Sequence, residues 1–119
     1  MSAVQTYMTT SIETESRGRI VVLLYDGAIQ FLLKAREALQ HQDHASKNKW
    51  IAKARDIILE LNQVLDLEAG GELAQNLRSL YNFLWRYLGE VNMKNDVQML
   101  EKAIGILDDL SGAWRKIAQ

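Results

Sequence analysis

The sequence predicts an all-α fold, an antiparallel up-down-up-down four-helix bundle that follows a flexible N-terminal arm. Three observations predict it. The 119-residue chain has no proline, the residue that most often interrupts helices. Apolar residues recur at helical spacing in four segments, at about residues 17–40, 45–67, 72–94 and 96–118. The breaks between these segments are short, so each helix must run antiparallel to the one before it.

The first 15 residues differ from the rest of the chain. They are rich in serine and threonine and show no sustained helical period, although they include Tyr7, Met8 and Ile12. We expect residues 1–15 to form the flexible arm and residues 16–119 to form the bundle. Ser16 is a candidate N-cap for the first helix.

Each predicted helix has one apolar face, which we expect to form the core. The face of the first helix centres on Leu24, Ala28, Phe31, Ala35 and Leu39, flanked by Val21, Leu32 and Ala38. The second has Trp50, Ala54, Ile57, Ile58, Leu61, Val64 and Leu65, and the third has Leu73, Leu77, Leu80, Tyr81, Leu84, Leu88 and Val91. The fourth has Leu100, Ala103, Ile104, Leu107, Leu110 and Trp114.

The residues in the breaks are typical of helix ends. Asp43 and Ser46 are candidate N-caps for the second helix. Gly70 and Gly71 follow that helix, where a residue of left-handed conformation commonly ends a helix.

The first helix has a second apolar face. Val22, Ile29 and Leu33 lie far from its predicted core stripe, and Tyr25 bridges the two sets. A continuous exposed apolar stripe often marks a partner site, and an amphipathic helix of a partner fits such a stripe. The candidate partner-binding residues are Tyr7, Ile12, Val22, Tyr25, Ile29 and Leu33, and the arm is expected to cover this stripe when the partner is absent.

Leu59, Phe83, Met99 and Ile106 on the other helices also fall outside the predicted core faces. Taken singly, each fits the scattered exposed apolar residues that are normal in a monomeric protein.

Composition argues against several classes of function. The net charge of −1 disfavours nucleic-acid binding. The absence of cysteine excludes a thiol nucleophile, a disulfide framework and cysteine-based zinc sites. The longest apolar run, residues 20–25, is far shorter than the roughly 20 residues that span a bilayer, and the N-terminus has no signal-peptide pattern. We therefore predict a cytoplasmic protein without membrane insertion.

The sequence offers no catalytic chemistry, and we predict neither an enzyme nor a cofactor. Its histidines, His41 and His44, fall in a predicted turn with no carboxylates arranged to complete a metal site. Asp108 and Asp109 are adjacent on a helix and do not share a face. No catalytic, cofactor-binding or metal-binding residue is assigned.

Several motifs resemble the FliS family of flagellar secretion chaperones. They are LYDGAI at residues 24–29, KARDIILEL at 53–61, and GGELAQNL at 70–77 followed by LY at 80–81. Asn92, Asn95 and Asp96 match the family's asparagine–aspartate pattern, and AWR at residues 113–115 resembles its closing motif. The resemblance covers about residues 7–117. The chain departs from the family pattern where Ser16-Arg17-Gly18-Arg19 replaces a serine–proline–glutamate–glutamate opening, and at Val91, where alanine is usual.

The resemblance implies a cytoplasmic export chaperone. Proteins of this family are antiparallel helical bundles that bind the disordered C-terminal segment of flagellin, block its premature polymerisation and assist its delivery to the flagellar type III export apparatus. Further implied partners are the flagellar export gate and other flagellar regulators. The alternative from a different class is a regulatory helical bundle that binds a folded protein partner.

Overall fold

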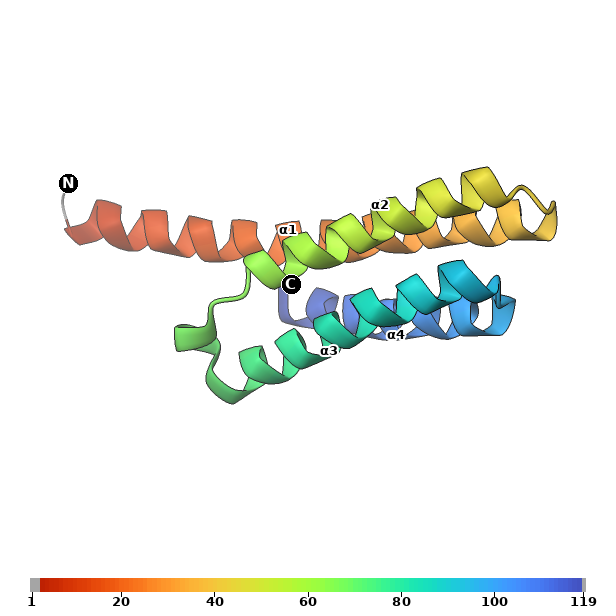
Figure 1. Cartoon of the computed structure of the whole chain (residues 1–119). Helices are drawn as coiled ribbons and strands as arrows, with labels where there is room; N and C mark the ends of the chain where they lie inside the picture. The colour runs from red at the N-terminus through yellow and green to blue at the C-terminus, as the bar shows by residue number, and fades with distance from the viewer. Residues whose placement is uncertain (1–2, 119) are drawn as a thin grey trace.

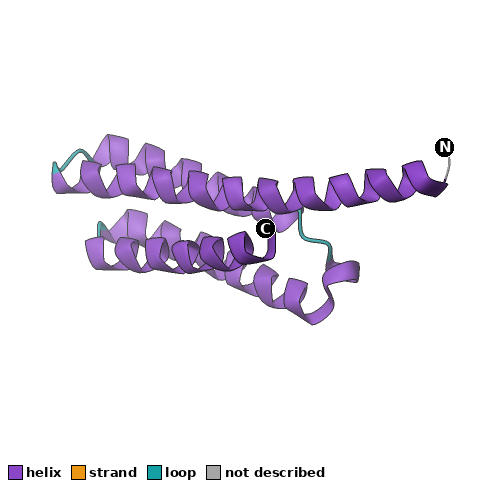
Figure 2. Cartoon of the chain, turned by 180° about the vertical axis from the view of Figure 1, so that it is seen from behind, coloured by secondary structure: helices purple, strands orange, loops and turns teal. Residues whose placement is uncertain are grey.

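Four helices make up the structure, a computed structural model that describes the backbone of residues 3–118 and the side chains of residues 18–116. They are α1 (Ala3–Gln40), α2 (His44–Gln63), α3 (Leu67–Lys94) and α4 (Val97–Ala118). Within residues 3–118 there is no strand (Figure 2). The predicted all-α fold is confirmed.

The helices form an antiparallel bundle in which neighbours along the chain pack together. α1 lies against α2 and α4, and α3 lies against the same two helices, so α1 and α3 occupy opposite corners. The pair α1–α2 forms one layer and α3–α4 the other (Figure 1). The N-terminal part of α1 projects beyond the other helices, and the molecule measures 59 × 24 × 22 Å.

Aspartates begin three of the helices. Asp43 Oδ1 accepts a hydrogen bond from the Ser46 amide (3.1 Å), so Asp43 rather than Ser46 is the N-cap of α2. Asp66 caps α3 in the same way, through the Ala69 amide (3.0 Å). Asp96 accepts from the first amides of α4, at 2.9 and 3.2 Å. These contacts satisfy amides that have no partner inside the helix.

A buried lysine holds the turn between α3 and α4 against the start of α2. Lys47 is 2% exposed, and its Nζ donates to the Asn92 carbonyl (2.8 Å) and to Asn95 Oδ1 (2.5 Å). Desolvation lowers the pKa of this amine because burial disfavours its charged form. Asn95 itself has the left-handed conformation (φ 53°) that ends α3.

The connection between α2 and α3 differs from the prediction. α2 ends at Gln63 rather than near residue 67, and α3 begins at Leu67. Gly71 has the expected positive φ (53°), but its ψ of −129° differs from the left-handed helical conformation, and the residue forms a kink that separates the short helical turn at residues 67–70 from the long helical segment that follows. The start of α3 near this kink lies away from the other helices, and Leu73 there is exposed. Val64 at the end of α2 is also exposed. Both residues were wrongly predicted to belong to the core.

The core of α1 is rotated relative to the prediction. Tyr25, Ala28, Leu32 and Ala35 are fully buried, whereas Leu24 and Phe31 are only half-buried. The rest of the core agrees better with the sequence pattern. It consists of Ile51, Ala54, Ile58 and Leu61 on α2, Leu77, Tyr81, Leu84, Leu88 and Val91 on α3, and Leu100, Ala103 and Leu107 on α4.

The start of α1 was also predicted wrongly. The helix begins at Ala3 and passes through Ser16, which is therefore not its N-cap. The side chains of residues 1–17 lie outside the described part, so the flexible arm over residues 1–15 stays a prediction.

We predict that Gly71→Ala lowers the free energy of unfolding by about 1–3 kcal/mol, because a side chain disfavours this positive-φ conformation. Steric crowding is not the cause of this loss, since a Cβ at Gly71 would have no neighbour within 4 Å. Gly105→Ala is the matched control: Gly105 is helical and equally open, so alanine there should raise stability by about 1 kcal/mol. Urea unfolding of both variants measures this, and equal effects would contradict the account.

Candidate protein-binding surfaces

The apolar stripe predicted on α1 lies along its border with α4. Val22, Ile29 and Leu33 are all partly exposed, and Ile29 also packs against the core. Asp26 lies on the same side of α1 and contacts Ser111 and Arg115 of α4. The stripe therefore lies next to α4. Three of the six predicted partner-binding residues therefore share one accessible edge.

The other three predicted residues are placed differently. Tyr25 is fully buried, so its predicted role as a partner contact has no support in this conformation. Tyr7 and Ile12 lie outside the side chains that the structure describes, and their roles stay predictions.

Tyr25 belongs to a polar network inside the core. Its hydroxyl is hydrogen-bonded to the Tyr81 hydroxyl of α3 and accepts a bond from Trp114 Nε1 of α4 (3.1 Å). Burial raises the pKa of both tyrosines, because desolvation opposes the tyrosinate form. The network is structural, because it joins three helices.

Asp26 forms a second link between α1 and α4. Ser111, itself buried, donates its hydroxyl hydrogen to Asp26 Oδ1 (2.9 Å), and Arg115 forms a salt bridge with Oδ2. Asp26 therefore has a structural role in joining α1 to α4. The accessible part of this edge consists of the apolar side chains on either side of Asp26.

A second apolar surface lies between α3 and α4. Asn82 and Trp85 lie on the flank of α3 that contacts α2, where they form hydrogen bonds with α2 side chains. The opposite flank of α3 carries Leu80, Phe83 and Tyr87, and this flank borders α4. The α4 residues on the facing flank are Met99, Ile106 and Leu110, which are partly exposed. We call these six residues the α3–α4 groove.

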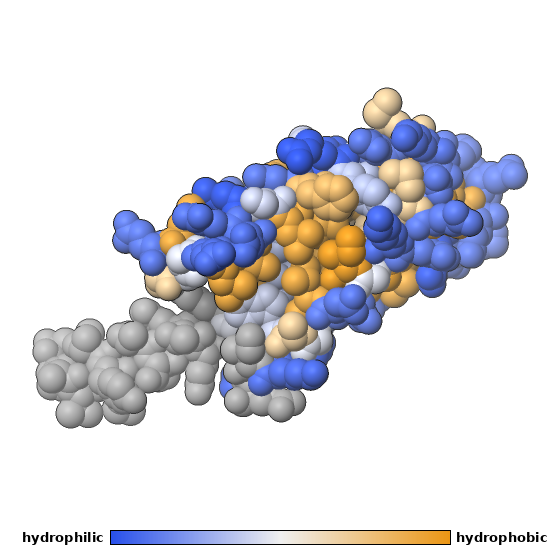
Figure 3. Space-filling model, turned by 90° about the horizontal axis from the view of Figure 1, so that it is seen from below, coloured by the Kyte–Doolittle hydropathy of each residue, from blue (hydrophilic) through white to orange (hydrophobic). Residues whose placement is uncertain are grey.

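The α3–α4 groove forms a continuous apolar area. Viewed from the side of α3 and α4, apolar residues gather in a broad band with polar residues around it (Figure 3). The Phe83 and Tyr87 rings stack with centroids 5.3 Å apart, and Phe83 is 40% exposed. The sequence pattern singled out Phe83, Met99 and Ile106 one by one, but only the fold brings them together.

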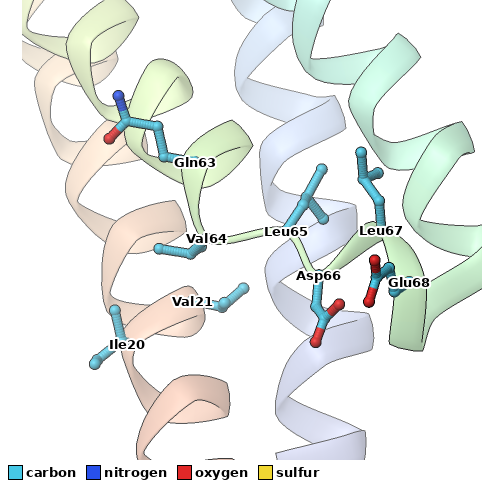
Figure 4. A pocket seen from close by; sticks show the side chains of 8 residues that line it. All are labelled: Ile20, Val21, Gln63, Val64, Leu65, Asp66, Leu67 and Glu68. Atoms are coloured by element: carbon cyan, nitrogen blue, oxygen red, sulfur yellow. The ribbon is translucent and has the colours of Figure 1, made fainter.

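A cavity of about 470 Å³ lies where α2 ends beside α1. Figure 4 shows Ile20 and Val21 of α1 across from the segment 63–68, which supplies Val64, Leu65 and Leu67. Its polar lining comes from Gln63, Asp66 and Glu68. The sequence did not predict this cavity, because it depends on the early end of α2.

The described residues show no site for metal chemistry. They contain no group of three or more histidine, cysteine, aspartate or glutamate side chains placed to hold an ion. His41 and His44 are exposed at the turn between α1 and α2. Over residues 3–118, no helix is long and apolar enough to cross a membrane.

Two apolar surfaces on one helical bundle are typical of a protein that binds other protein chains, because a long partner chain can contact both of them. The chain belongs to the FliS family: the family model for flagellar protein FliS matches residues 1–119. The resemblance seen in the sequence motifs is therefore confirmed.

Characterised relatives cover nearly the whole chain. The flagellar secretion chaperone FliS of Vibrio cholerae is 35% identical over 97% of this chain and 88% of its own length. The FliS proteins of Salmonella typhimurium and Bacillus subtilis are 35% and 33% identical, over 98% and 95% of this chain and 90% and 84% of their own lengths. This family membership gives the chain the general role of a flagellar secretion chaperone.

We predict that Tyr81→Phe lowers the free energy of unfolding at pH 7 by about 1–2 kcal/mol, because a buried hydrogen bond is lost. The deficit should shrink above about pH 10. There the unfolded tyrosine releases its proton while folded Tyr81, whose pKa is raised, keeps it.

The folded state then binds more protons than the unfolded state, so wild-type stability falls by up to about 1.4 kcal/mol per pH unit. The variant lacks this contribution. Urea unfolding of both proteins at about pH 7 and about pH 11 measures the change. A deficit that stays constant or grows would show that Tyr81 is not held in its protonated form.

Proposed function

We propose that this protein is a cytoplasmic export chaperone that binds the disordered C-terminal segment of flagellin. In this role it prevents premature polymerisation of flagellin and assists its delivery to the flagellar type III export apparatus, where the export gate and other flagellar regulators are further partners. Its action is binding rather than catalysis. The observation that carries the proposal is the apolar α3–α4 groove on a chain of the FliS family.

The shape of the apolar surface suits a disordered ligand. A segment that folds on binding loses conformational entropy, and it offsets this loss by covering a large area. The α1 stripe and the α3–α4 groove lie on opposite flanks of α4, because Ser111 and Arg115 face α1 while Ile106 faces α3. A chain that wraps around α4 can therefore reach both surfaces.

The groove favours helical segments of the ligand. Its residues line two neighbouring helices, and the apolar face of an amphipathic helix fits between such helices. Val22, Ile29 and Leu33 form the second contact region of the proposal. Tyr7 and Ile12 are proposed to cover part of this region in the free protein. Tyr25 is proposed to act indirectly, because it holds α1 in the position that exposes this region.

We predict that calorimetric titration with the C-terminal segment of the organism's flagellin gives binding with a large negative heat-capacity change, because apolar surface is buried. Phe83→Asp and Leu33→Asp should each weaken binding by at least about tenfold, which is about 1.4 kcal/mol. Both side chains lie on the proposed contact surfaces.

Matched controls place the same charge outside the two surfaces. Gln75→Asp on α3 and Gln30→Asp on α1 change exposed polar residues, and they should leave the affinity within about twofold. Thermal melts monitored by circular dichroism establish that each variant is folded. If the folded wild-type protein does not bind the segment, the regulatory bundle that binds a folded partner becomes the better explanation.

A further inference from the structure

The outer face shared by α2 and α3 has a charge pattern that the proposed export role does not use. It is lined by Arg55, Leu59 and Asn62 of α2 and by Arg78, Asn82, Trp85 and Arg86 of α3. Asn62 Nδ2 donates to Asn82 Oδ1 across the two helices (2.9 Å), which places these residues side by side. We call this surface the arginine face.

Arg55 is held in one position at the centre of the arginine face. Its Nε donates to the Trp85 carbonyl (3.0 Å), and its guanidinium lies over the Trp85 ring, with Cζ 3.8 Å from the centroid. Gly89 makes room for it, because a Cβ there would lie 3.1 Å from Nη2. A lone surface arginine moves among many rotamers, so this fixed guanidinium loses less entropy when it binds a ligand.

The terminal nitrogens of Arg55 remain available. The ion pairs among the described side chains are Lys94–Glu90 and Arg115–Asp26, so no carboxylate of residues 18–116 lies within 4 Å of the three arginines of this face. By helical register Glu60 of α2 lies on the side away from Arg55, whereas Asp56 borders the face next to Leu59. The three arginines of this face therefore carry positive charge that no ion pair with a described side chain offsets.

Apolar side chains accompany this charge. Trp85 is 37% exposed and Leu59 is 45% exposed, on either side of Arg55. Tryptophan and arginine are enriched among the residues that contribute most to protein–protein binding. A planar guanidinium with two free nitrogens matches a carboxylate, with which it forms paired hydrogen bonds.

We propose that the arginine face is a docking site for an acidic segment of a protein partner, one that presents carboxylates beside apolar side chains. A carboxylate binds the free edge of Arg55, and apolar residues of the segment contact Trp85 and Leu59. Arg78 and Arg86 attract further acidic residues. This site lies on the opposite flank of α3 from the α3–α4 groove, so a partner here and an export substrate there do not compete for the same residues.

The test uses two synthetic amphipathic peptides of about 18 residues, long enough to form a helix when bound, and one oligonucleotide. The first peptide carries glutamate and leucine at helical spacing, and the second has glutamine in place of every glutamate. The oligonucleotide is single-stranded and is matched in charge to the first peptide. Titrations are followed by the indole N–H resonances of the full-length protein, with Trp85 assigned from Trp85→Phe.

The acidic peptide should shift the Trp85 indole resonance but leave that of Trp114, which is hydrogen-bonded inside the bundle. Arg55→Ala should weaken its binding by about tenfold or more, as expected when a charged hydrogen-bond pair is lost. Each of the variants Arg78→Ala and Arg86→Ala should weaken binding of the acidic peptide severalfold. These two arginines have exposed side chains that hold no other described residue in place. Arg19→Ala removes the same charge from α1 and should have no effect.

Three results would overturn the proposal. One is equal affinity for the glutamine peptide, which would mean that carboxylates are not recognised. Another is tighter binding of the oligonucleotide that is lost in the same variants, which would assign the face to nucleic acid. The third is a loss of flagellin-segment affinity in Arg78→Ala or Arg86→Ala as large as the loss for the acidic peptide, which would make the face part of the export-substrate site.

Discussion

Two tyrosine hydroxyls and one indole nitrogen meet in the middle of the bundle, and the rotation of three helices depends on them. Tyr25, Tyr81 and Trp114 come from α1, α3 and α4, and each polar atom would lose hydrogen bonds to water on burial if the others were not in place. Satisfying all three requires one particular rotation of each helix about its axis. Purely apolar contacts constrain that rotation less, because they have no direction.

The rotation decides which side chains remain on the surface. With Tyr25 turned inward, Val22, Ile29 and Leu33 lie at the border with α4, where Asp26 reaches Ser111 and Arg115. With Tyr81 turned inward, one flank of α3 carries Phe83 toward α4 and the other carries Trp85 toward Arg55. The same buried network thus produces an apolar surface on one side of α3 and a basic surface on the other.

The sequence predicted the helices better than their orientation. Four apolar-periodic segments, the Asp43 cap and the special conformation near Gly71 could be predicted because these signals are local. The core face of α1 could not, because Leu24 and Phe31 are as apolar as the residues that are buried. What decides between the faces is the hydrogen bond between the hydroxyls of Tyr25 and Tyr81, which are 56 residues apart in the chain.

The surfaces were predictable only in part, for a similar reason. Val22, Ile29 and Leu33 were identified because they repeat within one helix, whereas the α3–α4 groove combines residues from two helices and appears only when these are side by side. Leu73 and Val64 are exposed because the helices separate at the Gly71 end, which no helical periodicity reveals.

A crystal structure of the protein with the C-terminal segment of flagellin tests the central claim most directly. The account predicts helical density in the α3–α4 groove, continuing around α4 to Val22 and Leu33, with the Tyr25–Tyr81–Trp114 contacts unchanged. A segment bound elsewhere, or one that inserts into the core and separates these three side chains, would contradict it.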